Sequence, residues 1–424
     1  MTLRKGHIVS SLIIVTLFSS SLCNATISVH ESDLNITWGG SNWDFGHDIV
    51  LDDSGNIYIT GNTRSFGMGF YDAFIAKYDS AGNSLLNITW GGSDYDSGDA
   101  IALDDSGNIY ITGRTLSFTV GNYDAFIAKF DSAGNSLLNI TWGGSNNDEG
   151  DDIVLDNSGN IYITGETDSF GHNAFIAKYD SAGNSLLNIT WGGSDVGGNG
   201  NGIVLDESGK IYITGSVSGI GAGDYDAFIA KFDSAGNSLL NITWGGSNLE
   251  SGNDIVLDNS GNIYIVGHTN SFAVGNYDAF IAKFDSAGNS LFNITWGGSH
   301  YDPGSGITLD DSGNIYITGR TYSFGAGGYD AFIAKYDNAG NSLRSFTWGG
   351  SDDDGGSSIV LDDSGNIYIT GYTKSFGSGD RDAFIAKFLS GDDDTLKISG
   401  YNLFFLMSII TIVVFIIRKK LKNP

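Results

Sequence analysis

Carboxylates are the side chains of this sequence most able to do chemistry, and one acidic position recurs at nearly even spacing. Its six members are Asp44, Asp96, Asp148, Glu250, Asp302 and Asp354. Oxygen-rich segments 94–99 and 352–354 surround some of them, and Ca²⁺ takes roughly six to eight oxygen ligands. The candidate calcium ligands are therefore Asp94, Asp96, Asp99, Asp352 and Asp354. Alternatively, these carboxylates accept backbone hydrogen bonds in turns, because no complete EF-hand loop is present.

Aromatic side chains occur near these acids and could stack on sugar rings or anchor a protein partner. The candidates for such a binding face are Trp43, Asp44, Phe70, Tyr95, Tyr301 and Tyr322. The alternative is that the aromatic rings support the loops that carry them.

Histidines are the other residues with catalytic potential, and they are few. His47, His172, His268 and His300 fall in variable segments, and no two have the spacing of metal ligands on one element. No Gly-x-Ser-x-Gly motif and no phosphate-binding loop occurs. We therefore predict no catalytic residue and no cofactor, with calcium as the one alternative. An acid pair in a central channel would be the enzymatic alternative.

Six asparagines begin an Asn-Ile-Thr sequence that fits the acceptor pattern for N-glycosylation. They are Asn35, Asn87, Asn139, Asn188, Asn241 and Asn293. Glycans there would form a ring of sugars. The alternative is that Asn-Ile-Thr is simply strand sequence copied by duplication.

Internal repeats indicate the elements that position these residues. Asp-Ala-Phe-Ile-Ala-Lys begins at Asp72 and recurs about every 52 residues, in seven copies that include a variant at Asn173. In the first full repeat we expect strand A at 48–52, B at 56–61, C at 72–78 and D at 84–91. With 62 glycines and two prolines in 424 residues, this pattern predicts an all-β, seven-bladed β-propeller of four-stranded antiparallel blades.

The phase of the repeat predicts how the ring closes. The chain opens with a lone D strand at 33–39 and ends its repeats with a C strand at 382–388. An N-terminal outer strand would therefore complete the last blade and leave no large unpaired sheet edge.

The repeated motifs also carry a resemblance. Asp-x-Ser-Gly-Asn-Ile-Tyr-Ile-Thr-Gly, Asp-Ala-Phe-Ile-Ala-Lys and Trp-Gly-Gly-Ser together resemble the SBBP family of β-propeller repeats from bacteria and archaea, over about 35–388. The fourth repeat departs most, with Gly197 where the others have an acid. The resemblance implies a propeller fold and a surface location on a prokaryotic cell, for which an archaeal cell is the favoured case, without implying one activity.

The copies differ mainly in the B-to-C loops and the D-to-A links, which a propeller places on one face. The A-to-B and C-to-D turns scarcely vary and belong to the opposite face. Strand C runs toward the invariant face, so the chain is expected to leave the propeller there, near Leu389. The variable face would then point away from the cell.

The composition of the two ends of the chain is typical of targeting segments. We expect a signal peptide at 1–25, the propeller ectodomain at 26–389, an acidic linker at 390–397, a transmembrane helix at 398–417 and a basic cytoplasmic tail at 418–424. Two alternatives are a lipid anchor on Cys23 and later removal of the C-terminal helix by a sorting enzyme. The net charge of −28 argues against a nucleic-acid partner.

These inferences favour a non-enzymatic cell-surface propeller that presents a variable loop face for adhesion or binding. Its partner would be an extracellular carbohydrate or a surface protein, and a single helix would hold it in the cell membrane. The alternatives are a cell-surface carbohydrate-active enzyme and a purely structural component of the surface layer.

Overall fold

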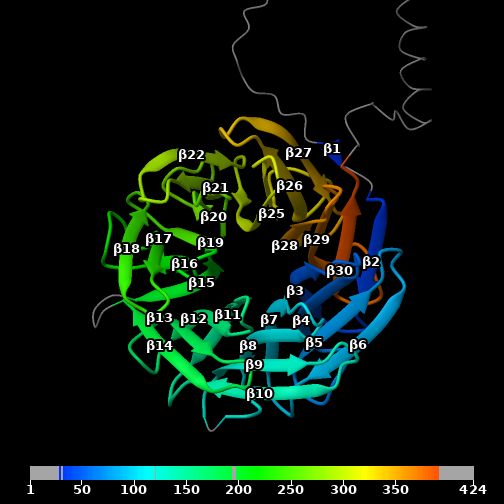
Figure 1. Cartoon of the computed structure of the whole chain (residues 1–424). Helices are drawn as coiled ribbons and strands as arrows, with labels where there is room; N and C mark the ends of the chain where they lie inside the picture. Colours follow the sequence, from blue (N-terminus) through cyan, green and yellow to red (C-terminus); the bar gives the residue numbers. More distant parts are fainter. Residues whose placement is uncertain (1–27, 30–31, 120, 193–196, 391–424) are drawn as a thin grey trace, which may run out of the picture.

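The computed structural model describes residues 28–29, 32–119, 121–192 and 197–390. Seven antiparallel sheets surround a common centre in the described residues (Figure 1), and each contains a meander of four strands. The predicted all-β, seven-bladed propeller is therefore confirmed.

The strands of each blade run outward from the centre in the order A, B, C and D. The A strands are β3 (Asp44–Leu51), β7 (Asp96–Leu103), β11 (Asp148–Leu155), β15 (Gly198–Leu205), β19 (Glu250–Leu257), β24 (Gly304–Leu309) and β28 (Asp354–Leu361). The B strands are β4 (Ile57–Thr63), β8 (Ile109–Thr115), β12 (Ile161–Thr167), β16 (Ile211–Val217), β20 (Ile263–Thr269), β25 (Ile315–Thr321) and β29 (Ile367–Thr373).

The two outer layers follow the same plan. The C strands are β5 (Asp72–Tyr78), β9 (Asp124–Phe130), β13 (Asn173–Tyr179), β17 (Asp226–Phe232), β21 (Tyr277–Phe284), β26 (Asp330–Tyr336) and β30 (Asp382–Phe388). The D strands are β6 (Ser84–Trp90), β10 (Ser136–Trp142), β14 (Ser185–Trp191), β18 (Ser238–Trp244), β22 (Ser290–Trp296), β27 (Ser342–Trp348) and β2 (Leu34–Trp38).

The A strands are longer than the sequence pattern indicated. In the first blade, strand A begins at Asp44 rather than at Asp48. The pairing of β3 with β4 shifts between Gly46 and Asp48, so His47 lies in a β-bulge that interrupts the alternation of side chains. Some residues that the sequence pattern assigns to a variable link therefore belong to the innermost strands.

Among the described residues, every hydrophobic core cluster is shared between two blades. One cluster joins Tyr58 and Ile75 of the first blade to Ile111 and Phe126 of the second, and the other six clusters likewise span two neighbouring blades. Burying such side chains stabilises the fold by about 1.5–3 kcal/mol each. Each blade therefore depends on the blades beside it.

The tryptophan of each Trp-Gly-Gly-Ser motif reinforces these junctions. Trp38 stacks on Phe74 of the next blade with ring centroids 3.8 Å apart, and its Nε1–H donates to Asn87 Oδ1 at 2.8 Å. Equivalent stacks recur at the other six junctions. The repeated tryptophan is thus a contact between blades.

Ring closure follows the predicted scheme. β2 pairs antiparallel with β30, from Leu34 opposite Lys387 to Trp38 opposite Ala383, and completes the last blade (Figure 1). Two short strands were not expected: β1 (Ser28–Val29) pairs parallel with β27, and β23 (Tyr301–Asp302) pairs parallel with β21. β1 adds a fifth strand outside the sixth blade.

Three aspartates tie the innermost strands together near the centre of the ring. Asp48, Asp152 and Asp254 stand on alternate A strands, and each accepts the amide hydrogen of an isoleucine on the next A strand, at 2.9, 2.7 and 2.9 Å. Small residues occupy this position between them, namely Ala100, Gly202 and Gly306. Because the number of blades is odd, aspartates and small residues cannot alternate all the way round the ring. Ser358 of the seventh blade instead donates a hydrogen bond to Asp48 at 2.7 Å.

Several sequence-based expectations lie outside the described residues. These are the signal peptide at 1–25, nearly all of the linker at 390–397, the transmembrane helix at 398–417 and the tail at 418–424. Within the described part of the chain, no helix is long and apolar enough to cross a membrane.

We predict that the closure strand contributes to stability through its inward face. Ile36→Ala removes a side chain that packs against the core shared by the first and last blades, and should lower the free energy of unfolding by about 2 kcal/mol. Thr37→Ala, one residue along on the exposed face of β2, should change it by less than about 0.5 kcal/mol. Denaturant titration compares the two, and equal effects would contradict this account of closure.

Candidate functional site

The variable loops gather on one face of the ring, as predicted. The B-to-C loop of the first blade contacts the next D-to-A link, because the Phe70 amide donates to the Asp94 carbonyl at 3.2 Å and the Asp96 amide to the Tyr71 carbonyl at 2.8 Å. On the opposite face, the chain leaves the last blade beside an A-to-B turn, where the Ser390 amide donates to Asn366 Oδ1 at 3.0 Å. We call these the variable face and the turn face.

The recurring acid of the D-to-A link is buried. Asp44 is 0% exposed, and it accepts hydrogen bonds from the Gly40 amide and from the hydroxyls of Thr63 and Ser65. Its five counterparts are equally buried. Asp44, which the sequence analysis places on the binding face, is thus a buried residue whose carboxylate fixes the link to the B-to-C loop of its own blade.

The fourth blade lacks this whole arrangement. Its strand register places Gly198, rather than Gly197, at the acidic position, because the link before it is one residue longer. The two hydroxyl partners are missing as well, with Val217 and Gly219 in their places. The acid, the threonine and the serine are thus present together in six blades and absent together in one.

A second carboxylate, buried or half-buried, faces the first across six of the seven blade junctions. Asp278, which begins the repeated Asp-Ala-Phe sequence, is 1% exposed, and among the described residues its Oδ1 has no hydrogen-bond partner. Burial and the nearby charge of Asp302 raise the pKa of Asp278 to about 6. The junction without an acid at Gly198 has Asn173 in place of this aspartate, so the two carboxyls are lost together.

The candidate calcium ligands lie in different surroundings. Asp96 and Asp354 are fully buried: Asp96 accepts from the hydroxyls of Thr115 and Ser117, and Asp354 from the Thr373 hydroxyl and the Ser375 amide. Asp94 is exposed beside Ser93, and Asp99 binds His47 in the centre of the ring. Among the described residues, none of the five candidates belongs to a group of three potential metal-ligating side chains within 4.8 Å of one another. Calcium binding stays a prediction.

The innermost strands differ most between blades where they approach the variable face. The bulge position carries His47, Asp99, Asp151, Asn201, Asn253, Ser305 and Ser357. The position that follows the glycine of strand B carries Asn62, Arg114, Glu166, Ser216, His268, Arg320 and Tyr372. We call these fourteen residues the central ring. Their variety on near-identical strands breaks the symmetry of the repeat at the centre of the propeller.

The second and third blades make the central ring acidic. Arg114 pairs with Glu149 at 2.5 Å, and His47 Nδ1 lies 2.9 Å from Asp99 Oδ1. Burial and the charges of Asp99, Glu149 and Glu166 raise the pKa of Asp151 well above its ordinary value. A carboxyl group whose pKa is raised in this way is suited to exchange a proton with a ligand.

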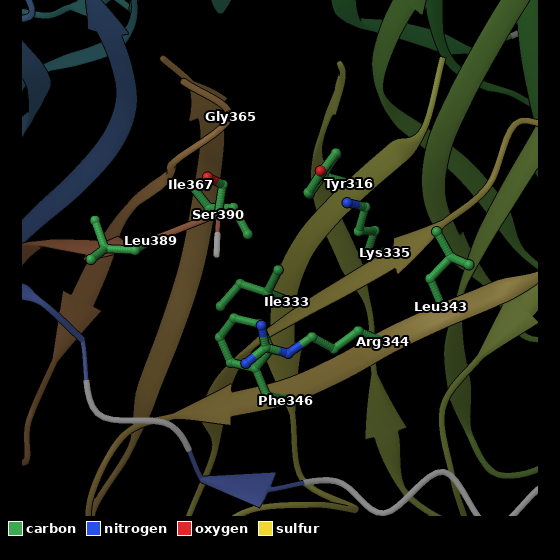
Figure 2. A pocket seen from close by; sticks show the side chains of 10 residues that line it. All are labelled: Tyr316, Ile333, Lys335, Leu343, Arg344, Phe346, Gly365, Ile367, Leu389 and Ser390. Atoms are coloured by element: carbon green, nitrogen blue, oxygen red, sulfur yellow. The ribbon is translucent and has the colours of Figure 1, made fainter. Parts of the chain in front are cut away.

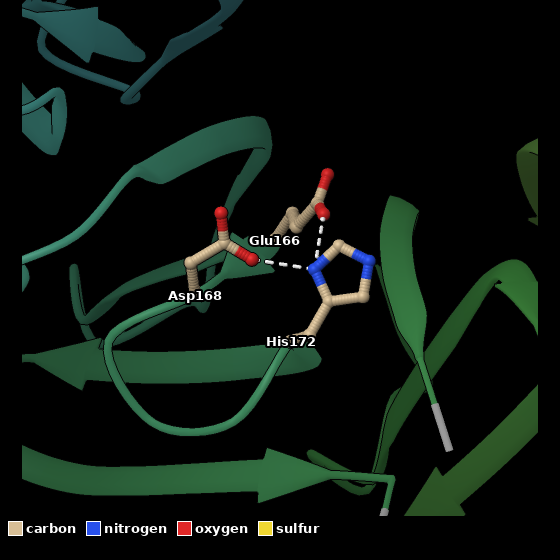
Figure 3. Close-up of side chains that lie close together, drawn as sticks. All are labelled: Glu166, Asp168 and His172. Atoms are coloured by element: carbon tan, nitrogen blue, oxygen red, sulfur yellow. Dashed lines mark hydrogen bonds and ion pairs between the residues drawn. The ribbon is translucent and has the colours of Figure 1, made fainter. Parts of the chain in front are cut away.

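A carboxylate–imidazole cluster lies at the edge of this acidic region (Figure 3). His172 Nδ1 is 2.5 Å from Asp168 Oδ1 and 3.1 Å from Glu166 Oε1. Hydrogen bonding to Asp168 raises the pKa of His172. Sequence reasoning treated His172 as a lone loop histidine and missed the cluster.

The opposite side of the central ring combines arginine with aromatic rings. The Arg320 guanidinium lies 5.3 Å from the ring centre of Tyr301 and 5.1 Å from that of Tyr329. Arg381 likewise contacts Trp43 and Tyr372, at 5.7 and 4.9 Å. Such cation–π contacts hold the rings in place.

The predicted aromatic candidates all lie on the variable face, with different exposure. Trp43, Phe70 and Tyr322 are 41, 56 and 49% exposed, whereas Tyr95 and Tyr301 are half-buried. Sequence reasoning missed a row of tyrosines just before the repeated Asp-Ala-Phe sequence, which are Tyr71, Tyr123, Tyr225, Tyr277 and Tyr329. Their recurrence before Asp-Ala-Phe was the available signal.

Neither His268 nor His300 joins a cluster of catalytic type among the described residues. His268 lies in strand β20, not in a loop, and burial lowers its pKa to about 4. His300 is exposed beside Tyr322, with ring centres 5.5 Å apart.

The six Asn-Ile-Thr asparagines lie on the outer strands with their side chains exposed. Each amide is already used in the fold: Asn87, for example, accepts from Trp38 Nε1 and donates to Ser84 Oγ at 2.9 Å. The copy without a sequon, at Ser345, lies on β27, the outer strand that β1 covers. Glycosylation stays a prediction.

A cavity of about 310 Å³ lies between the sixth and seventh blades and includes Arg344, Phe346 and Leu389 in its lining (Figure 2). At other junctions a C-to-D turn covers the neighbouring outer strand, as Gly82 does over Leu34 and Ile36. The seventh blade takes its D strand from the N-terminus and has no such turn in the described residues. The cavity is thus a consequence of ring closure.

We predict that the buried acid of the link stabilises the fold. Asp96→Ala leaves the Thr115 and Ser117 hydroxyls and the Gly92 amide without their acceptor, and should lower the free energy of unfolding by about 2–4 kcal/mol. Asp94→Ala, two residues away and exposed, should change it by less than about 0.5 kcal/mol. Thermal denaturation distinguishes the two, and an unaffected Asp96→Ala protein would refute the structural role.

We also predict that stability falls as the pH rises from about 4 to about 7. Asp278 and Asp330 have pKa values of about 6 and Asp254 about 7 in the folded protein, so the folded state holds protons that the unfolded state has lost. Protonation favours the folded state by about 3 kcal/mol for Asp278, and this contribution is lost above pH 6.

For turn aspartates such as Asp52, burial raises the pKa, but hydrogen bonds from the turn lower it by more, so the pKa is lowered overall. The stability that these ionised aspartates contribute is therefore lost below about pH 4. Maximum stability is therefore expected near pH 4–5. Asp278→Asn should flatten the decrease between pH 4 and 6. A stability profile that rises from pH 4 to 7 would contradict these assignments.

Comparison with known proteins agrees with the fold. The SBBP β-propeller repeat matches residues 38–66, 89–118, 140–171, 245–272, 296–325 and 348–377. These segments run from the tryptophan of strand D to the following B-to-C loop, and they leave out the equivalent stretch of the fourth blade. That stretch contains Gly198, Val217 and Gly219.

Regulatory protein FlaEY of Caulobacter vibrioides is 24% identical over 167 residues, which are 34% of this chain and 18% of that protein. The chain thus matches less than a fifth of the length of that relative. Among solved structures, Sqt1 from Chaetomium thermophilum superposes with a TM-score of 0.51 at 10% identity, over 85% of this chain and 100% of that one. A polysaccharide lyase of family PL25, an ulvan lyase, gives a TM-score of 0.51 at 13% identity, over 84 and 96%.

At these identities the solved structures show a shared fold alone. The match to the SBBP repeat is stronger evidence than the superpositions, because it recurs in phase with six of the seven blades. The chain therefore contains six matches to the SBBP β-propeller repeat, which lie within a seven-bladed propeller.

Proposed function

We propose that the protein is a non-enzymatic cell-surface propeller that binds extracellular carbohydrate through its variable face. The observation that carries this proposal is the arrangement of partly exposed aromatic rings and arginines around the central ring. Trp43 and Tyr322 expose large parts of their rings, and neighbouring arginines hold Tyr301, Tyr329 and Tyr372 in fixed orientations. Fixed aromatic faces with polar neighbours suit stacking on sugar rings.

The distribution of sequence variation supports the same face. The turn face repeats one arrangement, in which Asp52 accepts the Ser54 and Asn56 amides and Gly55 takes a positive φ of 75°. Such a face offers seven nearly equal surfaces. The central ring instead brings unlike side chains together on rigid strands, as a selective binding site requires.

The expected location at the cell surface also supports this proposal. The segments at 1–25 and 398–417 read as a signal peptide and a membrane anchor, and the last blade ends on the turn face at Leu389 and Ser390. An anchor that follows Ser390 would leave the variable face turned toward the surroundings of the cell. A surface protein as partner would use the same face.

A carbohydrate-active enzyme is the second candidate, and one observation favours it. Asp151, Glu149 and Glu166 lie near one another with raised pKa values, and burial is the largest cause for each. Groups of this kind act as general acids in glycan cleavage. A purely structural role would need neither these acids nor the exposed aromatic rings.

Binding of the full-length chain to a panel of soluble polysaccharides tests the proposal. We expect saturable binding without turnover, and Trp43→Ala and Tyr322→Ala should each weaken it by about tenfold or more, since stacking of one ring contributes roughly 1–3 kcal/mol. Leu239→Ala, a matched control on the exposed rim, should leave it unchanged.

Turnover that disappears in Asp151→Asn would establish the enzyme instead. The absence of binding across the panel and to whole cells would leave the structural role as the better account.

A further inference from the structure

The junction between the third and fourth blades departs from the repeat in several independent ways. Only five residues separate strand β12 from β13, whereas eight separate the same strands in the first blade. The residue just before strand C is His172, where five blades have tyrosine and one has arginine. His172 is also the one non-glycine residue with a positive φ, 47°, in the described part of the chain. The short loop thereby turns its imidazole back over the end of β12.

Two carboxylates lie at the end of strand β12. Glu166 and Asp168 occupy positions where the other six blades have no acid. Those positions carry Asn62 and Arg64, Arg114 and Leu116, Ser216 and Ser218, His268 and Asn270, Arg320 and Tyr322, and Tyr372 and Lys374. The acids and the histidine thus occur together in one blade.

Three ligand atoms of different side chains converge here (Figure 3). Glu166, Asp168 and His172 form one group in which each offers an atom within 4.8 Å of the others. His172 Nδ1 faces both carboxylates, at 2.5 and 3.1 Å. A single N–H points well at only one of two acceptors, whereas a cation is bound by all three atoms.

The geometry is close to that of a metal centre. A tetrahedral zinc ion bound at about 2.1 Å sets its ligand atoms roughly 3.4 Å apart. The contact of 3.1 Å is near this value, and the contact of 2.5 Å must lengthen by about 1 Å. His172 is 55% and the two acids 35% exposed at their side chains, so small rotations into this arrangement meet little resistance.

The surrounding charges favour a cation. Glu149 adds negative charge near Glu166, and Arg114, which pairs with Glu149, opposes it. The acids outnumber the one arginine in this part of the central ring. A divalent ion would reduce their mutual repulsion.

We propose that Glu166, Asp168 and His172 form a binding site for one divalent transition-metal ion of the zinc class. Mixed imidazole and carboxylate ligands suit zinc and its neighbours, whereas Ca²⁺ prefers oxygen ligands alone. Three protein ligands leave at least one coordination position open toward the variable face. The site therefore has room for an oxygen atom of water or of a bound molecule.

Isothermal titration of Zn²⁺ into the full-length chain, purified without a histidine tag, tests the proposal directly. We expect one ion per chain and much weaker binding of Ca²⁺. His172→Ala should weaken Zn²⁺ binding at least about 100-fold, because even partners outside the first coordination shell are worth about 10–100-fold. Asp168→Asn should also weaken it. His300→Ala, the control, removes an exposed histidine elsewhere on the same face.

Melting curves in the presence and absence of Zn²⁺ complete the test. The metal-free variants should melt at the temperature of the parent protein, which shows that they fold, and Zn²⁺ should raise the melting temperature of the parent and of His300→Ala alone. No binding by the parent protein at millimolar Zn²⁺ would overturn the proposal. Equal binding by His172→Ala would overturn it as well, since the ion would then lie elsewhere.

Discussion

The constraint on which this structure depends is that neighbouring blades share every hydrophobic cluster. Ile75 of the first blade and Ile111 of the second belong to one core, and the stack of Trp38 on Phe74 repeats this dependence across the point of closure. A blade without neighbours would leave both faces of its sheet exposed to water. The ring must therefore close, and β2 closes it by completing the last blade. The corresponding strands of different blades are nearly identical because every junction between blades must pack in the same way.

The same constraint decides where the copies are free to differ. Side chains between blades cannot change without disturbing a shared core. The aspartates of the turns are held because they accept hydrogen bonds from backbone amides of the same turn, as Asp52 does from Asn56 and Asp79 from Asn83. Variation is left to the innermost strands near the variable face and to the loops around them. At one junction the differences are concerted: Gly198, Val217 and Asn173 replace an acid, its threonine partner and the facing aspartate. The carboxylate–imidazole cluster of Glu166, Asp168 and His172 lies at that junction.

The repeats made the fold predictable and the site only partly so. Seven copies indicated the blade, the closure strand and the two faces, because duplication shows which residues every blade needs. The burial of Asp44 escaped prediction because its partners Thr63 and Ser65 follow 19 and 21 residues later. The bulge at His47 hid the true start of strand A, since it interrupts the alternation by which strands are read. His172 meets Glu166 only because its loop is short, and a loop's path does not follow from its composition.

Hydrogen exchange of the full-length chain, alone and bound to a molecule it captures, tests the central claim that the variable face around the central ring is the recognition surface. The account predicts slower amide exchange on binding in segments such as 43–48, 94–99 and 320–324. It predicts unchanged exchange in the A-to-B turns, of which Asp52–Asn56 is one. Protection confined to those turns or to the outer strands would contradict the account and place recognition on the turn face or the rim.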